Sequence, residues 1–143
     1  MPPMKFENVA SEGTQYSLPF LGSIQERLSE RLDVSALDGT NNVDSNGFLI
    51  PGAVLRLDST AKTLKAIDSG AQTARGVVLE AVKVAEGNST TQLNAAADLD
   101  VVIVVAATVD RAIGEYNLDR SYTANELTAF DNNDRLTLTD PES

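Results

Sequence analysis

The chain has 143 residues, which is the size of one domain or of one domain with an arm. It contains no Cys and no His, which excludes disulfides, thiolate zinc sites, a cysteine nucleophile and a Ser-His-Asp triad, and argues against ordinary hydrolase chemistry. Its 21 acidic and 11 basic residues give a net charge of −10, so neither nucleic acid nor an anionic membrane is expected as a partner.

No segment of the sequence is apolar over the roughly 20 residues that span a bilayer. The longest wholly apolar run extends from Val101 to Ala107, and residues 1–13 lack the apolar stretch of a signal peptide. We therefore expect a soluble protein without an export signal of the usual type.

The first 17 residues are polar and follow neither helical nor strand periodicity, so we expect an extended arm. From residue 20 onward, apolar side chains recur every four positions with polar residues between them: Phe20, Ile24, Leu28 and Leu32. This spacing predicts an amphipathic helix over residues 22–33. Two alternatives remain open for that helix, which packs either on its own domain or on another subunit.

Residues 36–47 are rich in turn formers and predict a loop at a boundary. We therefore divide the chain into residues 1–45, an arm with a helix, and residues 46–143, a β-rich domain. Within that domain, aliphatic and charged positions alternate over residues 53–58, 64–67 and 77–82. A period of two predicts half-buried strands.

Later segments complete the predicted fold. Residues 99–114 are β-branched without polar alternation, which indicates a strand covered on both faces, either centrally in the domain or by a second subunit. Thr123 and Glu126 match a capping box and predict a short helix through Phe130, while Leu136 and Leu138 predict a last strand. The predicted fold class is mainly β (α+β).

Few residues suggest a chemical site. Residues 42–47 match the first half of a calcium loop, but the twelfth position, which should be a Glu, is Ala53, so a plain Asx-rich turn is the main alternative. The acidic pairs Asp98/Asp100 and Asp131/Asp134 fit solvated turns at strand ends better than acid and base catalysis. We predict no catalytic residue, no metal site and no cofactor, and leave open whether the loop 38–47 holds a cation.

Three stretches carry a family resemblance. They are NGFLIPGAVLRLD with Gly52-Ala53-Val54-Leu55, then Ala74-Arg75-Gly76-Val77-Val78-Leu79, and finally the strand DVVIVVAATVD. In this order they resemble the lambda-type head decoration proteins of tailed bacteriophages. The resemblance covers residues 46 to about 110. The chain departs from it at Ala106-Ala107-Thr108, where a Gly is expected, and in the segment before the β domain.

The resemblance implies a small β-tulip or barrel-like domain that binds the outer surface of the virion capsid and stabilises the head. It also implies a homotrimer, with a dimer as the alternative, whose partner is the major capsid protein and which is made in the host cytoplasm. In such proteins an N-terminal arm orders on the capsid. The candidate capsid-binding residues are the apolar ones in and beside the arm: Phe6, Val9, Tyr16, Leu18, Phe20, Ile24 and Leu28.

Two other functions compete with this hypothesis of a non-enzymatic decoration protein. One is a β-sandwich module that binds carbohydrate or a cell surface, which is weakened because the chain has no Trp and few other aromatic residues for stacking. The other is an enzyme that uses carboxylates alone, with calcium as a possible cofactor, acting through Asp98 or Asp134.

Overall fold

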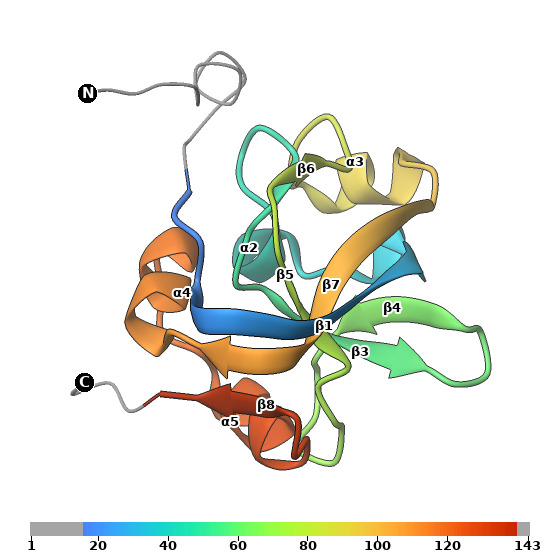
Figure 1. Cartoon of the computed structure of the whole chain (residues 1–143). Helices are drawn as coiled ribbons and strands as arrows, with labels where there is room; N and C mark the ends of the chain where they lie inside the picture. The colour runs from blue at the N-terminus through green and yellow to red at the C-terminus, as the bar shows by residue number, and fades with distance from the viewer. Residues whose placement is uncertain (1–15, 140–143) are drawn as a thin grey trace, which may run out of the picture.

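The computed structural model describes residues 16–139 and contains a six-stranded mixed sheet, a two-stranded ribbon and several short helices (Figure 1). The sheet has the order β1 (Phe20–Leu32), β4 (Thr63–Ala66), β3 (Val54–Asp58), β5 (Gly76–Val78), β7 (Leu99–Val109) and β8 (Leu136–Leu138). Strand β1 pairs with β7 as well as β4, so the sheet closes on itself. The predicted class, mainly β with helices, is confirmed.

The remaining elements are short. Strands β2 (Phe48–Leu49) and β6 (Val82–Lys83) form the separate ribbon. The helices are η1 (Val34–Ala36), α2 (Gly39–Asn42), α3 (Thr90–Ala95), α4 (Arg111–Leu118) and α5 (Ala124–Asp131). Helix α5 begins with the predicted capping box, in which Thr123 accepts from the Glu126 amide and the Glu126 carboxylate accepts from the Thr123 amide.

Strand β7 is the centre of the sheet. It pairs with three other strands: β1, β5 and β8. Its side chains at Ile103, Val104 and Val109 are fully buried. The prediction of a strand covered on both faces is confirmed for residues 103–107, where the domain itself supplies the cover, whereas Val102 is exposed. The strand ends at Val109 and α4 begins at Arg111, although the sequence pattern predicts a strand up to residue 114.

The predicted helix over residues 22–33 is wrong, because residues 20–32 form strand β1. A spacing of four places side chains on one face of a strand as well as of a helix, since four is twice the strand period. A packed helix also needs apolar residues at spacings of three, yet Ser23, Arg27 and Arg31 occupy those positions. Even-numbered side chains from Ile24 to Leu32 lie on the more buried face of β1, as strand geometry requires.

The sheet crosses the boundary proposed at residue 45. Leu32 pairs with Leu64, and Leu28 pairs with Ile103, so β1 contributes to the same sheet and core as the segment after residue 46. Within the described residues, the core is one cluster of mostly aliphatic side chains with three aromatic ones, Phe20, Tyr122 and Phe130. The rings of Tyr122 and Phe130 make an edge-to-face contact at 5.4 Å. Burial raises the pKa of Tyr122, so its hydroxyl stays protonated and donates to the Gly52 carbonyl at 2.8 Å.

The strand pair β5–β7 requires a residue without a side chain at Gly76. A Cβ atom there would lie 2.9 Å from the carbonyl oxygen of Val104 and 2.7 Å from Cδ1 of Ile103. The first of these atoms belongs to the backbone of the central strand, which cannot shift without disturbing its other pairings.

We expect Gly76→Ala to lower the free energy of unfolding by about 1–3 kcal/mol, because the added methyl group overpacks the core. Urea denaturation followed by circular dichroism measures the change. Gly70→Ala is the matched control, since its Cβ would meet only Asn125 Oδ1 at an ordinary 3.5 Å. Equal unfolding midpoints for the two variants would contradict the close contact.

The hairpin between β3 and β4 depends on Asp58. Its Oδ2 lies 2.8 Å from Lys65 Nζ, and its Oδ1 accepts from the amides of Thr60 at 2.9 Å and Ala61 at 3.0 Å. The hydrogen bond from Lys65, followed by those from the two amides, holds the pKa of Asp58 well below its ordinary value. The charged carboxylate therefore stabilises the folded state.

We expect Asp58→Asn to reduce stability at neutral pH and to have a smaller effect in acid. Because the folded-state pKa is lowered, the stabilisation is complete above the ordinary Asp value of 3.8 and is lost as the pH falls below it. Urea midpoints measured between pH 7 and pH 2.5 test this. Asp98→Asn, which removes an exposed carboxylate, is the control, and a constant difference between Asp58→Asn and the wild type across that range would refute the linkage.

Candidate functional site

The N-terminal end of the described chain is fixed to the domain by a buried amide. Asn117, on α4, is only 7% exposed. Its Oδ1 accepts from the Ser17 amide at 3.2 Å, and its Nδ2 donates to the carbonyl oxygens of Ser17 at 2.7 Å and Pro51 at 3.1 Å. One side chain therefore holds the backbone of Ser17 in the way a neighbouring strand would.

A second anchor lies one residue earlier. The Tyr16 hydroxyl donates to Asp44 Oδ2 at 2.6 Å. The other oxygen of Asp44 accepts from the amides of Asn46 at 2.9 Å and Phe48 at 3.0 Å, which makes this segment an Asx turn. Both oxygens of the carboxylate from the calcium-like pattern thus have protein partners. Ala53, at the closing position of that pattern, is fully buried in the core.

Exposed apolar side chains surround these anchors. Leu18 is 57% exposed, Leu21 is 46% exposed and Tyr116, next to Asn117 on α4, is 81% exposed. We call Tyr16, Leu18, Leu21 and Tyr116 the root surface, because the segment 1–15 joins the domain there. Hollows of about 460 Å³, beside Tyr16 and Tyr116, and about 400 Å³, beside Tyr16 and Leu18, adjoin it. Apolar groups next to hollows on a fixed backbone suit protein docking.

The predicted capsid-binding residues divide into three groups. Phe6 and Val9 lie outside the described residues. Tyr16 and Leu18 come together at the root surface. Phe20 is only 7% exposed and belongs to the core, while Ile24 and Leu28 are half-buried against it, because all three point inward from β1.

Sequence reasoning missed Leu21, Tyr116 and Asn117. Leu21 falls outside the spacing of four that relates Phe20, Ile24, Leu28 and Leu32, and it faces outward from β1. Tyr116 and Asn117 lie about 100 residues from Ser17 in the chain, so only folding brings them beside it. No local pattern in the sequence marks either residue.

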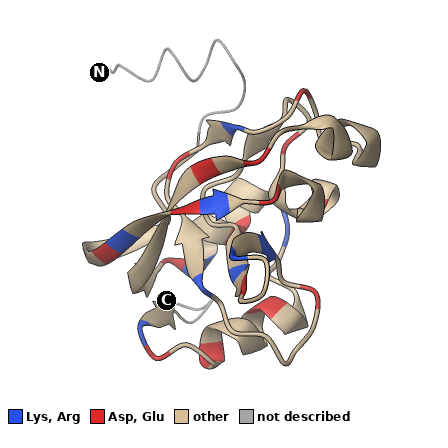
Figure 2. Ribbon diagram, turned by 90° about the vertical axis from the view of Figure 1, so that its right-hand side faces the viewer, with Lys and Arg blue, Asp and Glu red and all other residues tan. Residues whose placement is uncertain are grey.

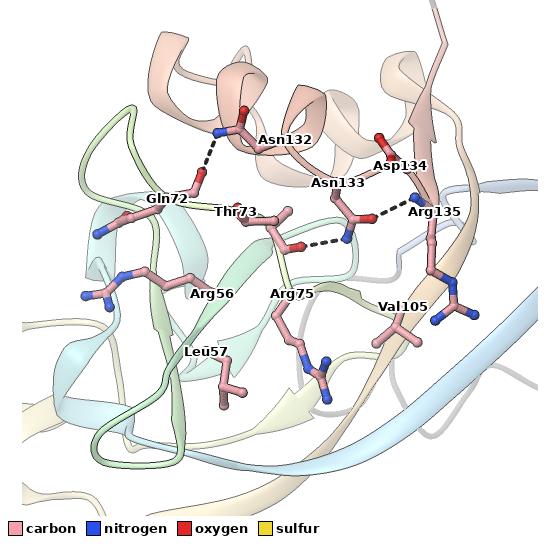
Figure 3. Close-up of a pocket in the computed structure, with 11 residues that line it drawn as sticks. Arg56, Leu57, Gln72, Thr73, Arg75, Val105, Asn132, Asn133, Asp134 and Arg135 are labelled. Atoms are coloured by element: carbon pink, nitrogen blue, oxygen red, sulfur yellow. Dashed lines mark hydrogen bonds between the residues drawn. The ribbon is translucent and has the colours of Figure 1, made fainter.

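A third hollow, which we call the arginine pocket, has a volume of about 640 Å³ and a mostly polar lining (Figure 3). Asn132 and Asn133, at the end of α5, donate to the carbonyl oxygens of Gln72 at 3.0 Å and Ala74 at 2.7 Å, which holds the loop before β5 in place. Figure 3 shows the guanidinium groups of three arginines around the opening: Arg56, Arg75 and Arg135.

Each of these guanidinium groups already has a carboxylate neighbour. Arg75 pairs with Glu30 and Arg135 with Glu26, which ties β1 to the residues just before β5 and β8. Arg56 donates to the Ala66 carbonyl at 2.9 Å and lies 3.7 Å from Asp68. The pocket is therefore close to neutral, and Figure 2 shows acidic residues spread over strands, helices and loops with the fewer basic ones among them. An anion gains little long-range attraction from such a surface.

Two properties of residues 16–139 bear on other kinds of site. In that range no group of three or more acidic side chains is arranged to hold a metal ion. None of the helices in the same range combines the length and the apolar character needed to cross a lipid bilayer.

Comparisons with known proteins add no relative: no protein-family model, no curated protein and no solved structure matches the chain.

We expect Asn117→Ala to destabilise the protein by about 1–3 kcal/mol, since Pro51 O and both backbone groups of Ser17 lose a partner at a mostly buried position. Hydrogen exchange at the Ser17 amide should accelerate as the root loosens. Asn132→Ala, which removes one exposed hydrogen bond to Gln72, is the matched control. Unchanged exchange at Ser17 in Asn117→Ala would show that this side chain does not hold the root.

Proposed function

We propose that this protein is a capsid decoration protein, which binds the outer surface of a phage head through its N-terminal segment and the root surface. Its partner is the major capsid protein, and several copies together reinforce the shell, with a trimer favoured over a dimer. The protein works by binding and has no catalytic role. The resemblance of residues 46 to about 110 to head decoration proteins suggests this function.

The observation that carries the proposal is the anchored, apolar root. The side chain of Asn117 and the carboxylate of Asp44 hold Ser17 and Tyr16, so the residues that contact a partner start from a fixed point. Less conformational freedom is then lost on binding than if the whole segment hung from a loose loop. Leu18 and Tyr116 add exposed apolar area beside that point.

The apolar content of the segment fits the same role. Phe6 and Val9 precede the root, so a partner that contacts the whole segment meets a series of apolar side chains from residue 6 to residue 21. A segment of this kind can follow an extended path over two neighbouring subunits. Many such contacts, each of modest strength, add up over a shell.

The arginine pocket favours a second candidate function, a carbohydrate-binding module. Its amide and guanidinium groups are held in fixed positions and can hydrogen-bond the hydroxyl groups of a sugar. The lining includes no aromatic ring for stacking against a sugar face, which is why we rank this function second.

The test is binding to undecorated heads of the phage that encodes the protein, measured by co-sedimentation over a range of protein concentrations. Deletion of residues 1–15 should weaken binding at least about tenfold, and Tyr116→Ala should weaken it by about tenfold or more if Tyr116 is a central contact. Val102→Ser is the matched control, because Val102 is also exposed, at 43%, but lies far along β7 from the root.

Three outcomes would overturn the proposal. They are wild-type affinity in both the deletion variant and Tyr116→Ala, equal losses in Val102→Ser and Tyr116→Ala, and no binding of the full chain to heads. Binding to a glycan array that is lost in Arg75→Gln, together with no association with heads, would instead support the carbohydrate-binding alternative.

A further inference from the structure

A hollow with a largely apolar lining lies beside α3 and has a volume of about 530 Å³. We call it the α3 hollow. It is formed between the segment that follows β6 and the segment that joins α3 to β7. The apolar residues that line it are Val84, Ala85, Ala95, Ala96, Ala97 and Leu99.

The surface of this hollow is not covered within residues 16–139. Ala95 and Ala97 are exposed, and Ala96 and Leu99 are half-buried. Covering contiguous apolar surface of this kind with another apolar group lowers the free energy of the system. The rim carries charges of both signs, since Lys83, Glu86 and Asp98 also line the hollow.

The hollow is near the root of the N-terminal segment. The Tyr16 hydroxyl contacts Asp44, and Asp44 and Gly47 are the two ends of one turn, with the Gly47 amide 2.9 Å from the Asp44 carbonyl oxygen. The carbonyl of Gly47 then accepts from the amides of Val84 at 2.8 Å and Ala85 at 3.2 Å, both of which line the hollow. The turn 44–47 therefore links the root directly to the wall of the hollow, and Figure 1 shows this turn and α3 on the same side of the sheet.

We propose that the segment before Tyr16 docks on its own domain, with Phe6 in the α3 hollow. Phe6 lies ten residues before Tyr16. An extended chain of that length reaches about 33 Å. The ends of a four-residue turn are less than about 7 Å apart, so the path from the root over residues 44–47 to the hollow is well within reach.

Chemistry also favours this occupant. Phe6 supplies an apolar ring of the kind that the alanine-rich wall lacks, and Val9 adds a second apolar side chain three residues closer to the root in the sequence. In the sequence, Lys5 and Glu7 flank Phe6 with one charge of each sign, and the rim of the hollow also carries both signs, at Lys83, Glu86 and Asp98. The same chain is preferred over a second copy because the tether raises the local concentration of the segment.

Docking of this kind gives the segment two alternative positions. In the free protein Phe6 then occupies the α3 hollow, and a partner that binds Phe6 must compete with that contact. Only molecules whose segment has left the hollow can bind the partner. The measured affinity for the partner is therefore reduced in proportion to the fraction of molecules in that undocked state. This inference concerns the free protein, so it stands or falls separately from the identity of the partner.

The chain has no cysteine, so a pair of introduced cysteines reports on proximity without further changes. We would compare Phe6→Cys/Ala96→Cys with Phe6→Cys/Asn132→Cys, whose second cysteine lies at the end of α5, on the opposite side of the molecule from α3 in Figure 1. Under mild oxidation, the first pair should form an intrachain disulfide at least about tenfold faster than the second. Circular dichroism verifies that both variants fold, and Ala97→Cys, at an exposed position, replaces Ala96→Cys if that variant unfolds.

Equal rates for the two pairs would overturn the proposal, and so would a product with twice the mass of the chain, which would assign the contact to a second copy. A second measurement uses natural side chains. Phe6→Ala should accelerate hydrogen exchange at the amides of Ala96 and Leu99 several-fold, whereas Ser11→Ala, in the same segment, should leave it unchanged. Identical exchange in Phe6→Ala and the wild type would also contradict docking in the hollow.

Discussion

The backbone pairing of β7 is the interaction on which the rest of the structure depends. This strand is hydrogen-bonded to β1, β5 and β8, and no other strand among the described residues has three partners. An unpaired peptide group in an apolar interior is costly, so a long buried strand must be paired on both edges. The run of β-branched residues from Val101 to Val105 makes burial favourable, and the three neighbouring strands make it possible.

Pairing of β1 with β7 also determines where the candidate site lies. Because the first residue of β1, Phe20, pairs with the last residue of β7, Val109, the start of β1 and the start of α4 are adjacent. Ser17, which precedes β1 by three residues, is thereby brought beside Asn117. Two side chains of β1 also form ion pairs with arginines of the arginine pocket, Glu26 with Arg135 and Glu30 with Arg75.

Local patterns predicted several elements correctly and failed at others for identifiable reasons. The capping box at Thr123 was read correctly because its hydrogen bonds lie within one helical turn. Helix α3 has the same kind of signal, with Ser89 and Gln92 as its capping pair, but its six residues carry too little apolar periodicity to stand out. The spacing of four in β1 was misread because it fits two periodicities, and β7, the partner that decides between them, lies about 70–90 residues further along the chain.

Residue types and short-range alternation are enough to establish the lack of cysteine and histidine chemistry, the acidic charge, the aliphatic core and the positions of most strands. The three-dimensional fold is needed to establish that residues 20–32 are a strand, that Phe20 is buried while Leu21 is exposed, and that Asn117 holds Ser17. Each of these results depends on pairing or packing between residues that are distant in the chain. The free energy of such contacts is set by the partner, which a local pattern does not contain.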